Sequence, residues 1–231
     1  MDHFQAIEVI DSLVLRVLAE HGVERPPVDA VLLAAMHIGE IVINSKLTTR
    51  GHIQEVDGAG SVIAVRPERH PERHHWTVAH ELSESLKDEF FDLVDAGEDR
   101  HPQAAERMAN VFASRLLVPT AWLERDAYRC GFELPAIKRI YATASNEVIA
   151  MRLLDLAEPS AVAVFDHGRL VRRRSNVGHA VLTEAEKECQ AAVHRTGERQ
   201  QVRCGGIVAV GWPVNEDGWK REILRATPAD E

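Results

Sequence analysis

One amphipathic helix is predicted over Trp76-Thr-Val-Ala-His80-Glu81-Leu-Ser-Glu84-Ser-Leu-Lys87. Apolar residues recur along it at helical spacing: Val78, Ala79, Leu82 and Leu86. His80 and Glu84 are four residues apart, so their side chains share one face of the helix and lie one turn apart. The polar face therefore offers an imidazole and a carboxylate to the same neighbour.

This face nearly matches a known metal-binding pattern. In H-E-x-x-H helices, two histidines at i and i+4 bind zinc and the glutamate activates a water molecule. Here Glu81 follows His80 directly, and Glu84 stands where the second histidine would be. Taken alone, these five residues allow two interpretations. They form a metal site with one carboxylate ligand, or a solvated helix face with an incidental histidine.

Three histidines lie just before this helix, at positions 70, 74 and 75, in a predicted polar loop over residues 66–75. One of the last two could supply a nitrogen ligand in place of Glu84. Helix geometry argues against it, because His75 lies about 140° around a helix from His80. A solvated loop is the favoured interpretation.

A second helix is predicted from Gln103 to the proline at position 119, which ends it. Its apolar side carries Met108, Val111, Phe112, Leu116 and Leu117. Glu106 lies in its first turn, where an antiparallel neighbour could contribute a third ligand. Three protein ligands and one open position are typical of a catalytic metal site.

Together, these two helices resemble the ImmA/IrrE family of metallopeptidases. That family has a segment like R-x-T-x-A-H-E-L-G-H, followed later by E-x-x-A-N-x-F-A-x-x-L-L-x-P. The corresponding segments here are 73–84 and 106–119. The second segment matches at Glu106, Ala109, Asn110, Phe112, Ala113, Leu116, Leu117 and Pro119. The first departs from the family at Ser83-Glu84, where relatives have Gly-His.

The resemblance implies a zincin-like α+β fold and a metal-dependent endopeptidase. His80, Glu84 and Glu106 would be the metal ligands, and Glu81 would be the catalytic base. One histidine and two carboxylates leave a divalent ion with about zero net charge, whereas two histidines and one carboxylate leave +1. This ligand set predicts slower hydrolysis and a preference that moves from Zn²⁺ toward Mn²⁺.

Composition sets further limits. The 231 residues are 45% hydrophobic and 27% charged, which is ordinary for a soluble globular protein. The formal net charge of -9 disfavours non-specific binding of nucleic acid. No apolar run approaches the roughly 20 residues that a membrane helix needs, and no secretory signal is recognisable. Three widely spaced cysteines indicate no disulfide framework, and a reducing cytoplasm is expected.

Three parts are predicted along the chain. Residues 1–125 would form the zincin-like peptidase domain, with a small antiparallel sheet from strands at 40–44, 52–56 and 61–65. Residues 126–157 would be a helix-turn-helix-like segment. Residues 158–231 would be a small C-terminal α+β module, sensor-like in character. In this last part a hairpin is expected at 161–174 and a helix that begins with a capping box at Thr183.

The helix-turn-helix-like segment also has two interpretations. Helices over 134–142 and 146–156 could contact DNA, or they could complete the protein core. The second helix offers only Asn146, Glu147 and Arg152 as polar surface, which is a poor set for reading bases. Direct DNA binding is therefore open but not favoured.

Two functional hypotheses follow. In the first, the chain is a metallopeptidase that, like its family, cleaves a specific protein such as a transcriptional repressor of the helix-turn-helix type, in a stress or mobile-element response. In the second, the peptidase scaffold is catalytically weak or inactive and serves as a binding or sensor protein in the same regulatory role. Retention of His80, Glu81 and Glu106 favours the first, and Glu84 favours the second.

Overall fold

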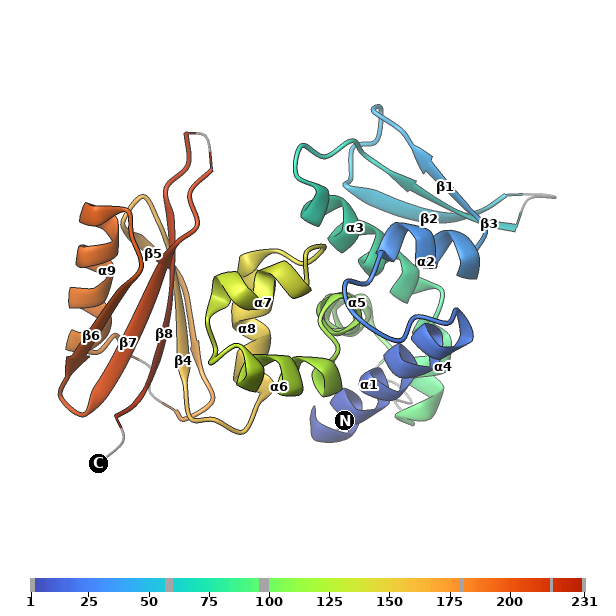
Figure 1. The fold of residues 1–231 in the computed structure, drawn as a ribbon. Helices are drawn as coiled ribbons and strands as arrows, with labels where there is room; N and C mark the ends of the chain where they lie inside the picture. The colour runs from blue at the N-terminus through green and yellow to red at the C-terminus, as the bar shows by residue number, and fades with distance from the viewer. Residues whose placement is uncertain (1–2, 57–59, 96–99, 179–180, 217, 230–231) are drawn as a thin grey trace. The chain divides into compact units, whose positions relative to one another are not determined.

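The computed structural model describes residues 3–56, 60–95, 100–178, 181–216 and 218–229 (Figure 1). Contacts divide the chain into two units. The first comprises Met1–Arg129 with Ile137–Ser145, and the second comprises Cys130–Ala136 with Asn146–Glu231. The division passes through the helices at 126–157, so these residues are shared between the units. The three-part domain organisation stays a prediction.

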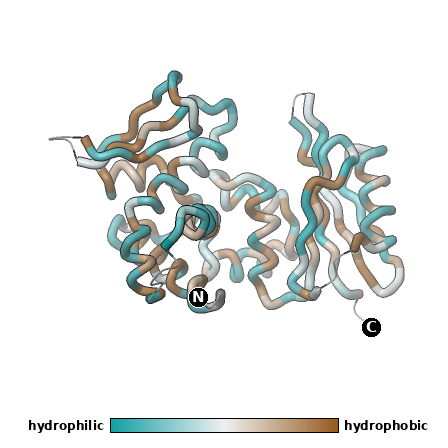
Figure 2. Tube along the Cα trace, turned by 180° about the vertical axis from the view of Figure 1, so that it is seen from behind, coloured by the Kyte–Doolittle hydropathy of each residue, from teal (hydrophilic) through white to brown (hydrophobic). Residues whose placement is uncertain are grey.

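The first unit is mainly helical. Its helices are α1 (His3–Glu20), α2 (Ala30–His37), α3 (Pro71–Glu84), α4 (Lys87–Leu93), α5 (Pro102–Leu117) and α6 (Thr120–Arg129), while α7 (Leu134–Ile140) spans the division between the units. Helix α5 packs against α1 and α3, and α3 also contacts α2 and the sheet. The core between them is fully buried and includes Leu18, Leu33, Leu82, Phe112 and Leu116. Apolar and polar segments alternate along these helices, as burial of one face requires (Figure 2).

A three-stranded sheet lies beside α3 in this unit. It consists of β1 (Glu40–Ile43), β2 (Gly51–Val56) and β3 (Gly60–Val65) in the order β1-β3-β2. The predicted antiparallel pairing is confirmed for β2 and β3, but β1 runs parallel to β3, so the sheet is mixed. Four consecutive buried residues, 62–65, give β3 the central position between two exposed strands. The α+β fold class is confirmed.

Helix α3 begins earlier than the sequence analysis predicts. It runs from Pro71 to Glu84, so His74 and His75 are helical and the predicted loop over 66–75 is wrong in its second half. Proline at the first helical position is preorganised for a helix start, which explains the difference. The helix ends before Lys87, where α4 begins.

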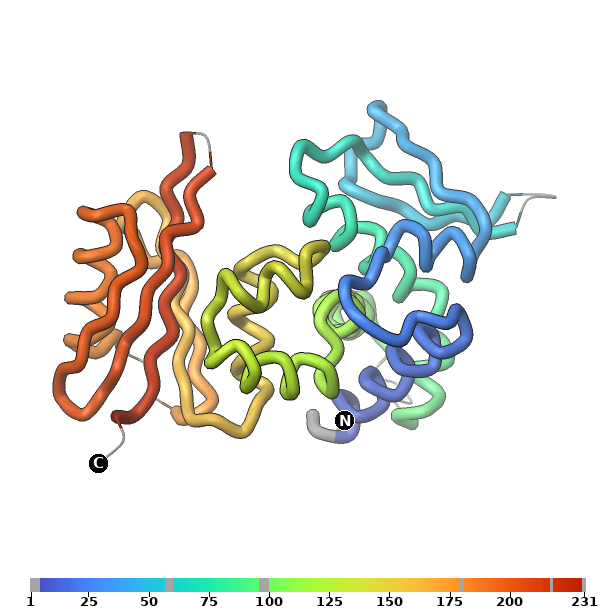
Figure 3. The backbone as a smooth tube through the Cα atoms, viewed as in Figure 1, coloured from blue at the N-terminus to red at the C-terminus, as the bar shows by residue number. Residues whose placement is uncertain are grey.

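The second unit is a five-stranded antiparallel sheet with helices. The strands β4 (Ala161–Asp166), β5 (Arg169–Ser175), β6 (Gln200–Cys204), β7 (Ile207–Pro213) and β8 (Arg221–Pro228) have the order β5-β4-β8-β7-β6. Helix α9 (Glu184–Thr196) packs along β6, β7 and β8 (Figure 3). Its buried residues Cys189 and Val193 join Phe165 and Leu224 in one apolar cluster. The predicted hairpin and the capping box at Thr183 are confirmed.

Helix α8 (Asn146–Arg152) and the short 3-10 helix η2 (Leu153–Asp155) complete the second unit. Helix α8 contacts β4 and β8 and buries Ile149 and Ala150. The Glu147 carboxylate pairs with Arg172 and Arg221, each at 3.1 Å. The polar surface of this helix is thus partly committed to packing, which supports the core-completing interpretation. Among the described residues, no helix combines the length and apolarity needed to cross a membrane.

Candidate active site

Two packed helices, α3 and α5, position the predicted site residues. The buried side of α3 carries Thr77, Val78, Ala79, Leu82 and Ser83. Burial of this side fixes the rotation of the helix and directs His80 and Glu81 away from the core. In α5, Pro102 occupies the first turn and the His101 ring nitrogen accepts a hydrogen bond from the Ala104 amide at 3.1 Å. Glu106 follows one turn later.

His80 and Glu106 meet between these helices. The distance from His80 Nε2 to Glu106 Oε1 is 3.3 Å, although the residues are 26 positions apart in sequence. Asn110 Nδ2 donates to the same oxygen, Oε1 of Glu106, and to the Glu106 carbonyl, both at 2.8 Å. The amide therefore fixes the direction of a carboxylate whose side chain is otherwise 64% exposed. Sequence reasoning did not assign this role to Asn110, although its i+4 spacing from Glu106 is the signal that indicates it.

Glu81 lies on the other side of the His80 ring. Its Oε1 is 3.7 Å from His80 Nδ1, and its side chain is 13% exposed. A Cβ placed on Gly51 of β2 would come within 2.7 Å of both Cγ and Oε1 of Glu81. The absence of a side chain at position 51 thus makes room for the predicted base. Sequence reasoning missed Gly51, since a glycine that opens a strand has no distinctive pattern.

Two carboxylates set the protonation of His80. The neighbouring Glu81 carboxylate is the largest influence and raises the pKa of His80. Partial burial acts in the opposite direction, and the charge of Glu106 adds to the increase. The net result is a pKa above the usual value for histidine, which is expected for an imidazole held between two negative groups.

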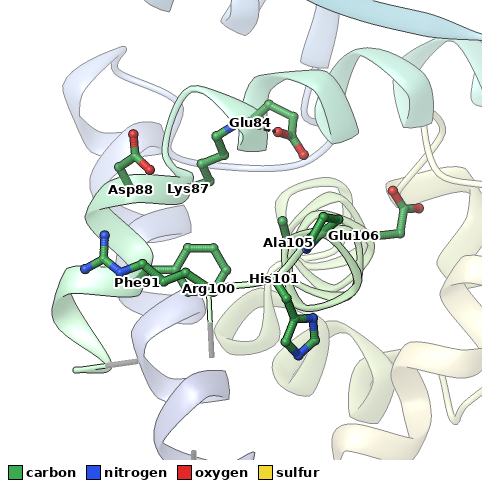
Figure 4. Close-up of a pocket in the computed structure, with 9 residues that line it drawn as sticks. Glu84, Lys87, Asp88, Phe91, Arg100, His101, Ala105 and Glu106 are labelled. Atoms are coloured by element: carbon green, nitrogen blue, oxygen red, sulfur yellow. Dashed lines mark hydrogen bonds and ion pairs between the residues drawn. The ribbon is translucent and has the colours of Figure 1, made fainter. Parts of the chain in front are cut away.

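Glu84 does not join this cluster. Its Oε2 accepts a hydrogen bond from Lys87 Nζ at 3.2 Å. A hollow of about 340 Å³ lies beside it, and Glu84, Lys87, Phe91 and Glu106 line part of its wall (Figure 4). The ligand atoms of His80, Glu84 and Glu106 do not all lie within 4.8 Å of one another. The structure therefore brings together His80 with Glu81 and Glu106, and leaves Glu84 paired with lysine.

His80 and Glu106 are spaced as two ligands of one divalent ion would be. Two ligands bound tetrahedrally at about 2.0–2.2 Å lie about 3.4 Å apart, close to the separation of His80 and Glu106. Glu84 is one helical turn from His80 and would have to leave Lys87 to join them. The Lys87 and Glu84 side chains are 45% and 24% exposed, so the pair is partly buried. Surface ion pairs contribute only about 0.2–1 kcal/mol, and this pairing is therefore a modest obstacle to metal binding.

The upstream histidines take no part in this cluster. His75 faces α2, with Nδ1 3.7 Å from the Asp29 carboxylate, and burial lowers the pKa of His75. This orientation agrees with the helix geometry that argued against His75 as a ligand.

A protein-family model matches the segment that carries the candidate active site. Residues 36–141 match the family model described as Peptidase_M78: IrrE N-terminal-like domain. This segment is an IrrE N-terminal-like domain. The resemblance to the ImmA/IrrE family is confirmed for it, and it contains His80, Glu81, Glu84 and Glu106. No curated protein matches the chain.

A solved structure shares the fold over most of the chain. It is described as a Mycobacterium tuberculosis transcriptional regulator, and it superposes with a TM-score of 0.67 at 17% sequence identity. The alignment covers 95% of this chain and 75% of that one. At this identity the likeness concerns the fold alone. The IrrE N-terminal-like domain thus occurs here within an architecture that a regulatory protein also has.

Proposed function

We propose that this chain is a metal-dependent endopeptidase that cleaves a specific protein, a transcriptional repressor of the helix-turn-helix type, in a stress or mobile-element response. The observation that carries the proposal is the 3.3 Å contact of His80 with Glu106, with Glu81 on the opposite side of the same ring. The M78 peptidase match and the regulator-like architecture support the regulatory setting. Because such a repressor acts on DNA, we place the reaction in the cytoplasm.

His80, Glu84 and Glu106 would hold the ion, which is Zn²⁺ or Mn²⁺. When bound, it supplies Lewis acidity that polarises the peptide carbonyl and lowers the pKa of water. Glu81 takes a proton from the attacking water and delivers it to the leaving amine. Asn110 keeps the Glu106 carboxylate directed toward His80. The β2 strand is an edge of its sheet and can align an extended peptide beside Glu81.

A second candidate is regulatory binding without cleavage. The observation that favours it is the pairing of Glu84 with Lys87, which leaves only two predicted ligands in contact. In this case the IrrE N-terminal-like domain captures the repressor but does not hydrolyse it.

The test compares cells that express the wild-type chain with cells that express Glu81→Gln. Glu81→Gln keeps the size of the side chain and removes the base. Sequencing of protein N-termini should show new termini in one repressor with the wild type only, and affinity capture with Glu81→Gln should recover that repressor intact. New termini that are equally abundant with both chains would exclude Glu81 as the base. Capture of the repressor by both chains without new termini would favour the binding role.

A direct measurement of metal affinity tests Glu84. Glu84→His replaces oxygen with nitrogen and should strengthen Zn²⁺ binding relative to Mn²⁺. Lys87→Met releases the carboxylate from its ion pair and should strengthen binding of both ions. Unchanged affinity in both variants would show that position 84 is not a ligand.

A further inference from the structure

A second group of metal-ligating side chains lies at the ends of α1 and α2. It consists of Glu20, His21 and His37, and one ligand atom from each lies within 4.8 Å of the other two. Within the described part of the chain, no other three His, Cys, Asp or Glu residues meet this condition. His21 Nε2 is 3.0 Å from His37 Nδ1, and the two rings are nearly perpendicular at 85°.

The backbone explains how the three residues meet. Helix α1 ends at Glu20, and Gly22 follows with a φ of +68°, a left-handed conformation that favours glycine. The Gly22 amide donates to the Ala19 carbonyl at 3.1 Å and the Val23 amide to the Leu18 carbonyl at 2.9 Å. These two bonds form a Schellman motif, which places His21 at the helix C-cap.

Helix α2 ends in the same place with His37 in its last turn. The C-terminus of a helix carries a partial negative charge, because its last carbonyl groups have no partner within the helix. Two such ends meet here beside the Glu20 carboxylate. The local field therefore favours a cation.

We propose that Glu20, His21 and His37 bind a divalent transition-metal ion of the zinc class, at a site separate from the candidate active site. Two imidazole nitrogens and one carboxylate oxygen are a donor set that suits Zn²⁺. Two ligands at about 2.0–2.1 Å from a tetrahedral ion lie about 3.3–3.4 Å apart, so the 3.0 Å between the ring nitrogens needs only a small adjustment. A water molecule would complete the coordination.

Arg16 carries a positive charge near the cluster, which opposes a cation. Its Nε lies 3.6 Å from Glu20 Oε1. Its guanidinium is held by Glu89 of α4, with one of two hydrogen bonds measuring 2.7 Å, so its charge is largely neutralised.

The ion would fasten the end of α1 to the end of α2 across residues 22–36. Helix α2 contacts α3, the helix that carries His80. An ion that binds only the folded chain stabilises it by mass action. The ion would thus stabilise the packing of α2 against α3 without taking part in the chemistry of His80.

The test uses the full chain with His80→Ala, which removes the candidate active-site histidine. Competition with a chromophoric chelator should show one Zn²⁺ bound in this background. Since loss of a partner that only orients a ligand costs about 10–100-fold in affinity, loss of a ligand should cost at least as much. We therefore expect at least about tenfold weaker binding in Glu20→Gln, His21→Ala and His37→Ala. Exposed His52 provides the matched control, and His52→Ala should bind as the background does.

Thermal unfolding gives a second measurement. Zn²⁺ should raise the Tm of the His80→Ala chain and of its His52→Ala derivative, but not that of His80→Ala with His37→Ala. Glu20→Gln is the variant least expected to disturb folding, because the change is isosteric and the side chain is exposed. Its circular dichroism spectrum should match that of the His80→Ala chain. The proposal is overturned if the His80→Ala chain binds no Zn²⁺, or if Glu20→Gln and His37→Ala bind it as tightly as the control. Neither result would bear on the proposed peptidase.

Discussion

Gly51→Ala should damage the candidate active site from a neighbouring strand. The added Cβ would lie 2.7 Å from Cγ and from Oε1 of Glu81, and 2.7 Å from Cγ2 of Thr77. Thr77 is buried, and both residues belong to α3, so relief requires either displacement of the Glu81 side chain or movement of the helix away from β2. In both cases Glu81 loses its place beside His80.

The magnitude follows from two opposing effects. Overpacking of this kind costs about 1–3 kcal/mol of the free energy of unfolding. Replacement of glycine by alanine also restricts the unfolded chain, which stabilises the folded state by about 0.4–1 kcal/mol. With the midpoints of the two ranges, about 2 kcal/mol and about 0.7 kcal/mol, the net loss expected for Gly51→Ala is about 1.3 kcal/mol. Hydrogen exchange of peptides from α3, followed at increasing urea concentrations, measures this loss of unfolding free energy in the first unit.

A second background tests whether the crowding is the cause. In the double variant Thr77→Ala with Glu81→Ala, all three crowded atoms are absent. Gly51→Ala should then stabilise the chain by about 0.4–1 kcal/mol, since only the effect on the unfolded state remains. The reasoning is refuted if Gly51→Ala costs the same free energy in both backgrounds, or if it costs nothing in the wild type.

Three further predictions follow from other side chains. Burial favours the protonated form of Glu72, but the 2.8 Å hydrogen bond from Lys138 contributes to a net lowering of the pKa of Glu72. The ionised Glu72 therefore stabilises the folded chain above the pKa that Glu72 has in the unfolded chain, and this stabilisation is lost as pH falls through its lower pKa in the folded chain. The free energy of unfolding of Lys138→Met, measured with urea, should depend less on pH in the acid range than that of the wild type. Asp11→Ala removes a carboxylate 2.5 Å from buried Arg115 and should cost about 2–3 kcal/mol in the same urea measurement. Burial raises the pKa of Cys189 to about 11, so mass spectrometry should find this thiol unlabelled by iodoacetamide at pH 8 until the second unit unfolds.

Much of the fold follows from local patterns in the sequence. The capping box at Thr183 and the hairpin of β4 and β5 depend on neighbouring residues, and the structure confirms both. The parallel pairing of β1 with β3 could not be predicted in the same way. It depends on which strand takes the central position, and that is decided by burial against distant helices.

The same distinction holds for the candidate site, where relations within one helix are predictable from the sequence and contacts between elements are not. Helical spacing relates His80 to Glu84 because both lie on α3, and it relates Glu106 to Asn110 on α5. It cannot show that Lys87 competes for Glu84, since that pairing depends on where α3 ends and α4 begins. Nor can it reveal that Gly51 admits Glu81, because β2 and α3 approach each other only in the folded chain.

Two proposed metal sites of different character change how metal content should be interpreted. The site at the ends of α1 and α2 has two imidazoles and one carboxylate, whereas the candidate active site has one imidazole and two carboxylates. Nitrogen-rich ligation favours Zn²⁺, and oxygen-rich ligation moves the preference toward Mn²⁺. Zinc in the purified chain would therefore report first on His21 and His37 and would say little about catalysis. Loss of bound manganese in Glu106→Gln, together with its retention in His37→Ala, would support the proposed peptidase site.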